Sequence, residues 1–259
     1  MSKVLDLHQH SRLHVVGVGG PGMSAIATCL VQMGHEVSGS DIKNSDVIDR
    51  LSGLGIQINI GHDQSVVRGC DAVTASTAIP RSNIELVEAE QSGVRVLTRA
   101  AMLASICAMR PSIAVAGTHG KTTTSTLVAH ILHSTIGCNA FLGGISSNFN
   151  SNVLLSNTSR TVVEADEFDR SFLTLYPKIS ALTSMDADHL DIYGNEASIR
   201  EGFLLFLKQT REEGSVVVKK ELNIHEDLKS ARSGVFTYSI LSEADYVATN
   251  IRIEEGAYV

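Results

Sequence analysis

Short runs of β-branched and other apolar residues alternate with amphipathic segments from residue 13 onward. Residues 13–18, 35–41, 72–77 and 94–98 have the composition of buried strands. Residues 22–34, 45–55 and 83–93 have helical spacing and end at glycine. Strand, helix and strand in repeated succession predict a parallel sheet with helices on both faces. We therefore expect an α/β domain over residues 1–107.

A second cycle of the same kind begins at residue 112. A strand over residues 112–117 runs into a helix that stops at Gly137, and a Gly/Ser/Asn-rich loop is predicted over residues 143–152. Further strands are expected at 160–166, 179–186, 214–220 and 234–240, with a helix at 199–208. These elements predict a second α/β domain over residues 108–259. Residues 250–259 are typical of a strand, a turn and the start of another strand, so we expect this domain to be incomplete.

The composition narrows the class of ligand. Of 259 residues, 21 are basic and 28 acidic, which gives a net charge of -7, and no Lys/Arg block stands out. This balance argues against nucleic-acid binding, so any bound phosphate must be held by local geometry.

The four cysteines form no C-x-x-C pair, and we expect reduced, packed thiols. No segment has the roughly 18 apolar residues of a membrane span, and no signal peptide is evident, so we expect a cytoplasmic protein without membrane contacts.

A glycine loop follows the first predicted strand. Gly17, Gly19 and Gly22 match G-x-G-x-x-G, and Asp41 follows about 20 residues later. Taken alone, this pattern favours a Rossmann-like fold and an NAD-dependent dehydrogenase. A tight strand-to-helix turn without a ligand would have the same residues, and the pattern does not specify which nucleotide is bound.

The segment AVAGTHGKTTT contains a second glycine-rich turn between a strand and a helix. Backbone N–H groups and the helix N-terminus would hold phosphate, Lys121 would reach its oxygens, and Thr122 would ligate Mg²⁺. The first glycine of the longer P-loop pattern is replaced by Val115. A chance Gly/Lys/Thr cluster that caps a helix is the alternative. A dehydrogenase has no need of this loop, which counts against NAD.

Two further residues follow apolar strands in the same half of the chain. Glu164 ends TVVE, and His189 lies in SMDADHLDIYG. A carboxylate and an imidazole at strand ends would face the phosphates and hold a divalent metal. Otherwise Glu164 would begin a solvated acidic loop, and His189 would be an ordinary surface histidine.

Five segments in this order, GVGGPGMS, GSD, AGTHGKTTT, VVEADEFDRSFL and SMDADHLDIYG, resemble the Mur ligases of peptidoglycan synthesis from residue 12 to residue 259. The resemblance is strongest to members that join L-alanine to the lactoyl carboxylate of UDP-N-acetylmuramate. It implies a Rossmann-like UDP-sugar-binding domain and an incomplete P-loop-type domain that binds ATP and Mg²⁺. It also implies a further C-terminal domain in the relatives that is absent here.

The resemblance also implies roles for individual residues. Lys121, Glu164 and His189 would be catalytic, and Thr122, Glu164 and His189 would hold Mg²⁺. The ATP loop would comprise Gly117, Thr118, His119, Gly120, Lys121, Thr122 and Thr123. The UDP-sugar contacts would comprise Gly17, Gly19, Gly20, Pro21, Gly22, Met23, Ser40, Asp41, Ser76 and Thr77, with Asn148, Asp169 and Ser171 nearer the muramoyl end.

The implied reaction passes the γ-phosphoryl group of ATP to the substrate carboxylate, and the amine of alanine then attacks the acyl phosphate. No side-chain nucleophile is required. Two alternatives stay open: a ligase that attaches a recovered tripeptide to the same sugar nucleotide, and a non-catalytic nucleotide-sugar binder.

Overall fold

The computed structural model describes residues 4–76, 78–167, 170–186, 196–229, 234–254 and 257–258. The described residues divide into two compact units: Met1–Pro111 with Ala129–Thr161, and Ser112–Val128 with Val162–Val259. The predicted boundary between residues 107 and 108 stays a prediction, because this division also assigns residues 129–161 to the first unit.

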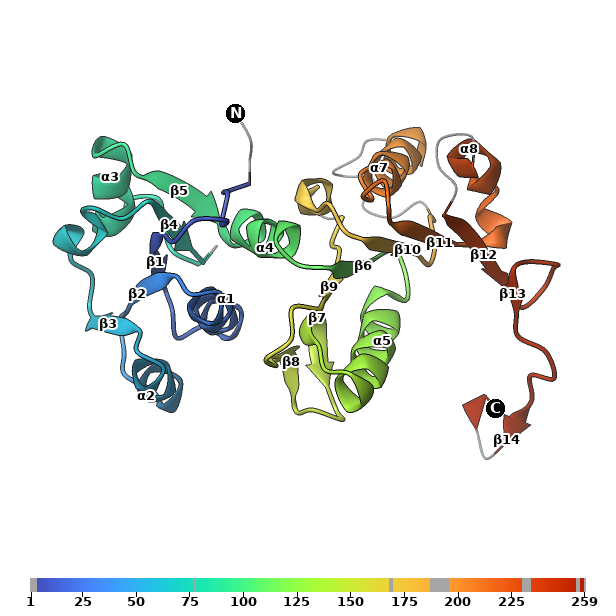
Figure 1. The fold of residues 1–259 in the computed structure, drawn as a ribbon, viewed down its shortest axis with the longest axis horizontal. Helices are drawn as coiled ribbons and strands as arrows, with labels where there is room; N and C mark the ends of the chain where they lie inside the picture. Colours follow the sequence, from blue (N-terminus) through green and yellow to red (C-terminus); the bar gives the residue numbers. More distant parts are fainter. Residues whose placement is uncertain are drawn as a thin grey trace. The chain divides into compact units, whose positions relative to one another are not determined.

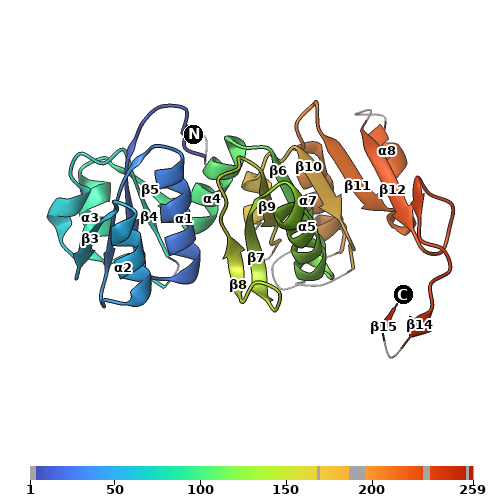
Figure 2. The same ribbon diagram turned by 60° about the horizontal axis from the view of Figure 1, so that its bottom comes forward.

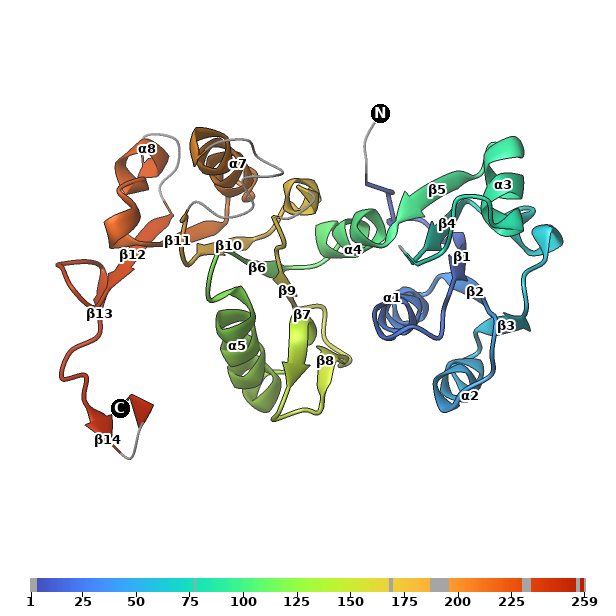
Figure 3. The ribbon, with the colours of Figure 1, turned by 180° about the vertical axis from the view of Figure 1, so that it is seen from behind.

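The first sheet has five parallel strands in the order β3-β2-β1-β4-β5. Figures 1 and 3 show α1 and α2 on one side of this sheet and α3 on the other. The α/β class and the parallel sheet are thus confirmed. The elements are β1 (Arg12–Val16), α1 (Pro21–Gln32), β2 (Glu36–Asp41), α2 (Asp46–Gly53), β3 (Gln57–Ile60), η1 (Gln64–Val67), β4 (Ala72–Ala75), α3 (Ile84–Gln91), β5 (Arg95–Thr98) and α4 (Arg99–Ala108).

Local chemistry explains where these helices begin. Pro21 opens α1, where its missing N–H costs nothing, and the side chains of Ser45, Asn83 and Thr98 cap α2, α3 and α4.

The strand β3 and the helix α4 were not predicted. The strand β3, QINI, has only four residues, which are exposed or half-buried, so its pairing with β2 rather than its own sequence identifies it as a strand.

The second sheet has eight strands in the order β13-β12-β11-β10-β6-β9-β7-β8. Figures 1 and 3 show α5 on one side of this sheet and α7 on the other, and Figure 2 shows β10, β11 and β12 side by side. The elements are β6 (Ser112–Ala116), α5 (Lys121–Thr135), β7 (Asn139–Ser146), β8 (Ser151–Leu154), β9 (Thr161–Glu164), η2 (Ser171–Thr174), β10 (Ile179–Leu182), α7 (Glu196–Lys208), β11 (Ser215–Lys219), η3 (Lys220–Leu222), α8 (His225–Lys229), β12 (Val235–Ser239) and β13 (Tyr246–Val247).

The loop predicted over residues 143–152 is shorter than expected, since only residues 147–150 form a turn. Its two ends complete β7 and begin β8, an antiparallel pair with Phe141 opposite Val153 and Ser146 opposite Ser151. Glycine, serine and asparagine have low strand propensity, and here cross-strand pairing overrides it. The two predicted terminal strands form the antiparallel pair β14 (Ile253–Glu254) and β15 (Ala257–Tyr258), and the turn predicted between them lies outside the described residues. None of the helices in the described ranges is long and apolar enough to cross a membrane.

Candidate functional site

The second glycine loop lies where β6 leads into α5, and β6 lies between β9 and β10 in the sheet. Gly117 has φ of 137° and Gly120 has φ of 81°. A Cβ on Gly117 would lie 2.2 Å from Thr183 Oγ1 and 2.9 Å from the Ser184 backbone nitrogen. Any side chain at position 117 would therefore collide with the segment after β10, so glycine is required on two independent grounds.

The segment after β10 holds this loop in place. Thr183 Oγ1 donates hydrogen bonds to the backbone oxygens of Ala116 (3.1 Å) and His119 (2.5 Å), and Ser184 Oγ accepts from the His119 N–H (2.7 Å). Thr118 Oγ1 lies 2.9 Å from Ser184 Oγ. Sequence analysis missed Thr183 and Ser184 as functional residues. Their signal was present, since both follow an apolar strand directly, but only His189 was considered in this segment.

The first turn of α5 faces the end of β9. Thr122 Oγ1 donates to Glu164 Oε1 (2.9 Å), and Ser125 Oγ donates to Glu164 Oε2 (3.4 Å). A hydroxyl and a carboxylate at one point form the hard oxygen donor set that Mg²⁺ prefers. These two residues thus fit a magnesium ion chemically.

The third predicted metal ligand, His189, lies outside the described residues, as do Thr77 and Asp169. No cluster of three or more His, Cys, Asp or Glu side chains that could hold a metal occurs within the described ranges. The proposed metal site therefore rests on Thr122 and Glu164.

The Lys121 ammonium lies inside the same loop. Its Nζ donates to the backbone oxygens of Gly117 (2.7 Å) and Thr118 (3.4 Å) and to Glu167 Oε1 (2.8 Å). The Lys121 side chain is 14% exposed and that of Glu167 is 1% exposed. Lys121 thus lies against the loop and has a carboxylate partner that sequence analysis did not assign, while its phosphate-binding role stays a prediction.

The first glycine loop lies at the carboxyl end of β1. The N–H groups of Gly17 and Val18 donate to the Ser40 backbone oxygen at 2.9 and 3.0 Å, and the Gly19 N–H donates to Asp41 Oδ2 at 2.8 Å. A Cβ on Gly17 would touch the side chains of Ile79 and Ser76. The structure therefore brings this loop, the end of β2 and the segment after β4 together, and their role as one binding site stays a prediction.

Two residues near this loop point inward. Ser40 is buried and donates from Oγ to Glu85 Oε2 (2.6 Å), and Met23 is buried in the core.

A Cβ on Gly22 would lie 3.3 Å from Arg99 Cδ, so the Arg99 side chain lies over the start of α1. Arg99 was missed as a phosphate-binding candidate, although its position at the end of a predicted strand was a signal. It supplies a cation beside the glycine loop.

A buried polar network lies behind this loop. Glu85 is fully buried; its Oε2 lies 3.6 Å from His14 Nε2 and 3.1 Å from His62 Nδ1, and its Oε1 accepts from the Asp63 N–H (3.2 Å). Burial raises the pKa of Glu85, but the interactions with His14, Ser40 and Asp63 outweigh it and lower the pKa below its usual value. Glu85 holds Ser40, and the Ser40 backbone holds the glycine loop.

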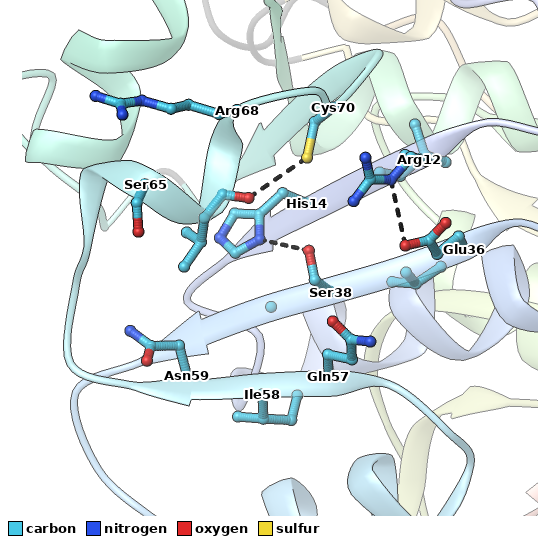
Figure 4. Close-up of a pocket in the computed structure, with 14 residues that line it drawn as sticks. Arg12, His14, Glu36, Ser38, Gln57, Ile58, Asn59, Ser65, Arg68 and Cys70 are labelled. Carbon is cyan, nitrogen blue, oxygen red and sulfur yellow. Dashed lines mark hydrogen bonds and ion pairs between the residues drawn. The ribbon is translucent and has the colours of Figure 1, made fainter.

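A polar cavity of about 380 Å³ opens on the β1-β2-β3 face (Figure 4). His14 Nδ1 lies 2.8 Å from Ser38 Oγ in its wall, and Arg12 pairs with Glu36 at its edge. Its lining includes residues 12–14, 36–39 and 57–59 rather than either glycine loop. This cavity is therefore separate from the predicted phosphate sites.

Two residues predicted to contact the muramoyl group, Asn148 and Ser171, form hydrogen bonds outside both glycine loops. Asn148 Nδ2 is 3.4 Å from His130 Nδ1, and Ser171 Oγ donates to the Asp166 backbone oxygen (3.3 Å) at the start of η2. Neither interaction involves a glycine loop, so the roles of Asn148 and Ser171 stay predictions.

The comparisons with known proteins identify the family of this chain. Residues 12–110 match the family model described as "Mur ligase family, catalytic domain", and residues 115–258 match "Mur ligase middle domain". The chain belongs to the Mur ligase family. The family assignment removes the support for the dehydrogenase interpretation of the first loop.

The curated relatives of this chain include ligases named for L-alanine. The UDP-N-acetylmuramate--L-alanine ligase of Geobacter sulfurreducens is 43% identical over 248 residues, which cover 95% of this chain and 54% of that protein. The ligase of the same name from Trichlorobacter lovleyi is 42% identical over 94% of this chain and 54% of its own length. The chain spans about half the length of the curated relatives it matches.

Solved structures with the same fold include two ligases. UDP-N-acetylmuramate-alanine ligase from Thermotoga maritima has a TM-score of 0.67 and 30% identity, with 94% of this chain and 55% of that chain covered. The UDP-N-acetylmuramate:L-alanyl-gamma-D-glutamyl-meso-diaminopimelate ligase from Neisseria meningitides has a TM-score of 0.68 and 25% identity, with 89% and 78% covered. Both confirm the predicted fold class.

Proposed function

We propose that this chain is the substrate- and nucleotide-binding part of a cytoplasmic ATP-dependent ligase. The ligase joins L-alanine to the lactoyl carboxylate of UDP-N-acetylmuramate for peptidoglycan synthesis. The observation that carries the proposal is the convergence of Lys121, Thr122 and Glu164 at one strand-to-helix loop, in a chain whose curated relatives are L-alanine ligases.

The residues of the second loop have distinct tasks in this reaction. When bound, MgATP supplies the phosphoryl group that converts the unreactive carboxylate into an acyl phosphate. The loop backbone from Gly117 to Gly120 would bind phosphate oxygens, and Lys121 would offset their negative charge. Thr122 and Glu164 would hold Mg²⁺, and His189 remains a third candidate. No side-chain nucleophile is needed.

The first loop would anchor the UDP of the sugar substrate. Its backbone is held by Ser40 and Asp41, and Arg99 lies beside Gly22. A glycine loop at a helix N-terminus favours a diphosphate. Because Asp41 Oδ2 accepts from the loop itself, a ribose hydroxyl would reach the other carboxylate oxygen or replace the Gly19 N–H.

Calorimetry of this chain tests the proposal. We expect saturable binding of MgADP and of UDP-N-acetylmuramate, and no comparable binding of NAD. Tight NAD binding, or failure of both ligands to bind a folded chain, would contradict the proposal. A ligation assay then tests the choice of amine. It uses a protein that contains this chain and has the full length of the curated relatives, with alanine and tripeptide as competing amines.

A second candidate function is ligation of a recovered tripeptide to UDP-N-acetylmuramate. The observation in its favour is the fold match to the Neisseria meningitides ligase. The higher identity to L-alanine ligases favours alanine. Faster turnover with tripeptide than with alanine would reverse this preference.

A further inference from the structure

Glu167 occupies an unusual position for an acidic residue in a phosphate-binding site. Its carboxylate is 1% exposed and lies 2.8 Å from Lys121 Nζ. A negative charge at this position opposes the binding of a phosphate, so its presence needs a physical explanation.

The contacts of Lys121 show what the carboxylate does. An ammonium group has three N–H donors, and among the described residues Lys121 Nζ has three acceptors: Gly117 O, Thr118 O and Glu167 Oε1. A phosphate oxygen must therefore replace or share at least one of them. Two acceptors are neutral carbonyls of the loop, whereas Glu167 cancels the charge that would attract the phosphate.

Glu167 is also held in place by its own backbone. The Ala165 N–H donates to Val115 O (2.9 Å), which ties this segment to β6, and the Arg170 N–H donates to Glu167 O (3.0 Å). Separating a buried carboxylate from an ammonium group 2.8 Å away costs free energy, so Glu167 resists separation from Lys121 when an anion arrives. Glu164, in contrast, faces Thr122 and is the better metal ligand.

We propose that Glu167 determines the anion selectivity of the second glycine loop. By neutralising Lys121 it weakens binding of bare phosphates, so the loop binds a phosphate ligand tightly only together with a divalent cation. Glu167 is thus a specificity-determining residue that acts through Lys121. The proposal rests on the phosphate-binding role given to this loop under the proposed function.

Calorimetry with inorganic pyrophosphate and with ADP, each with and without Mg²⁺, tests the proposal on the chain as it exists. We expect Glu167→Gln to bind the metal-free ligands about tenfold more tightly than the wild type, because one opposing charge near the phosphate is removed. The ratio of the affinity with Mg²⁺ to the affinity without Mg²⁺ should therefore fall. A purely structural role for Glu167 predicts weaker or unchanged binding, so the sign of the change separates the two explanations.

A charge cycle keeps the test informative if Glu167→Gln folds poorly. Lys121→Gln removes the charge of Lys121 and keeps that of Glu167, so this variant should bind metal-free pyrophosphate most weakly. The double variant restores a neutral pair and should bind more tightly than Lys121→Gln. Equal affinities of Lys121→Gln and the double variant would overturn the proposal, as would a Glu167→Gln variant that binds no more tightly than the wild type.

The control is Glu90→Gln, which makes the same change in net charge at an exposed position on α3. It should leave every affinity unchanged, and an increase like that of Glu167→Gln would assign the effect to net charge and refute the proposal. If a folded wild-type chain binds neither pyrophosphate nor ADP under any condition, the proposed nucleotide loop itself is refuted. Binding that is unaffected by Glu167→Gln refutes only the role of Glu167.

Discussion

The Thr122 hydroxyl donates a 2.9 Å hydrogen bond to Glu164 Oε1, which joins the first turn of α5 to the end of β9. The end of β9 and the start of α5, 42 residues apart in the chain, thus bring a carboxylate and a hydroxyl oxygen to one point. This geometry is what a metal bound beside a phosphate loop requires.

The Thr122→Val substitution tests this pair. Valine keeps the shape of threonine and removes the hydroxyl, so we expect about a tenfold loss of MgADP affinity and little change for metal-free ADP. Calorimetry with and without Mg²⁺ measures both. Thr126→Val, one turn further along α5, is the matched control. An equal loss with and without metal would show that Thr122 acts through the loop rather than through Mg²⁺.

Gly117→Ala should disrupt the phosphate loop. The new Cβ would meet Thr183 and the Ser184 backbone, and φ of 137° is unfavourable for alanine. We expect the free energy of unfolding to fall by about 3 kcal/mol and MgADP binding to be lost. Urea denaturation and calorimetry measure the two effects. Adding Thr183→Ala should rescue the stability only in part, because the collision with the backbone remains; full rescue would contradict this explanation.

Glu85→Gln should reveal a pH-dependent contribution to stability. Folding lowers the pKa of Glu85, so the ionised carboxylate stabilises the native state above the unfolded pKa of about 4.3. This contribution is lost as the pH falls through the folded pKa. At pH 7 we expect the variant to lose about 2 kcal/mol of stability in urea denaturation. The difference from wild type should shrink under acidic conditions, and a difference that grows on acidification would contradict the assignment.

Arg99→Ala should weaken UDP binding. The Arg99 side chain lies beside Gly22, where a cation would attract the substrate diphosphate. We expect roughly a tenfold loss of affinity for UDP-N-acetylmuramate, and the loss should diminish at high salt. Arg50→Ala, at an exposed position on α2, removes the same charge as a control. Equal losses of affinity in the two variants would show that the net charge of the protein, rather than the position of Arg99, accounts for the effect.

Cys29 should resist alkylation in the folded protein. Burial raises the pKa of its thiol to about 11, so little reactive thiolate is present at pH 8. Mass spectrometry after brief iodoacetamide treatment should show an unmodified Cys29 and faster modification of the half-buried Cys70. In urea both should react. Rapid native modification of Cys29 would show that the core around α1 opens.

Much of the site was predictable because its signals are local. Glycines that allow a strand to turn into a helix, a lysine and threonine at the start of α5, and a carboxylate directly after an apolar strand all lie within short segments. The parallel sheets followed from the alternation of strands and helices. In contrast, β3 was missed because it is short and has no buried residue, and the β7-β8 pair was missed because glycine, serine and asparagine have low strand propensity. In both cases pairing with a neighbouring strand decides the structure.

The sequence by itself determined the fold class, the two glycine loops and the residue types for phosphate and metal binding, since each depends on spacing within one strand–loop–helix unit. Only the tertiary structure decided which distant side chains meet those loops. Thr183 and Ser184 hold the second loop, Glu167 pairs with Lys121, and Glu85 supports Ser40 behind the first loop. These partners come from other strands and helices, so their positions depend on strand order and register, which no local pattern encodes.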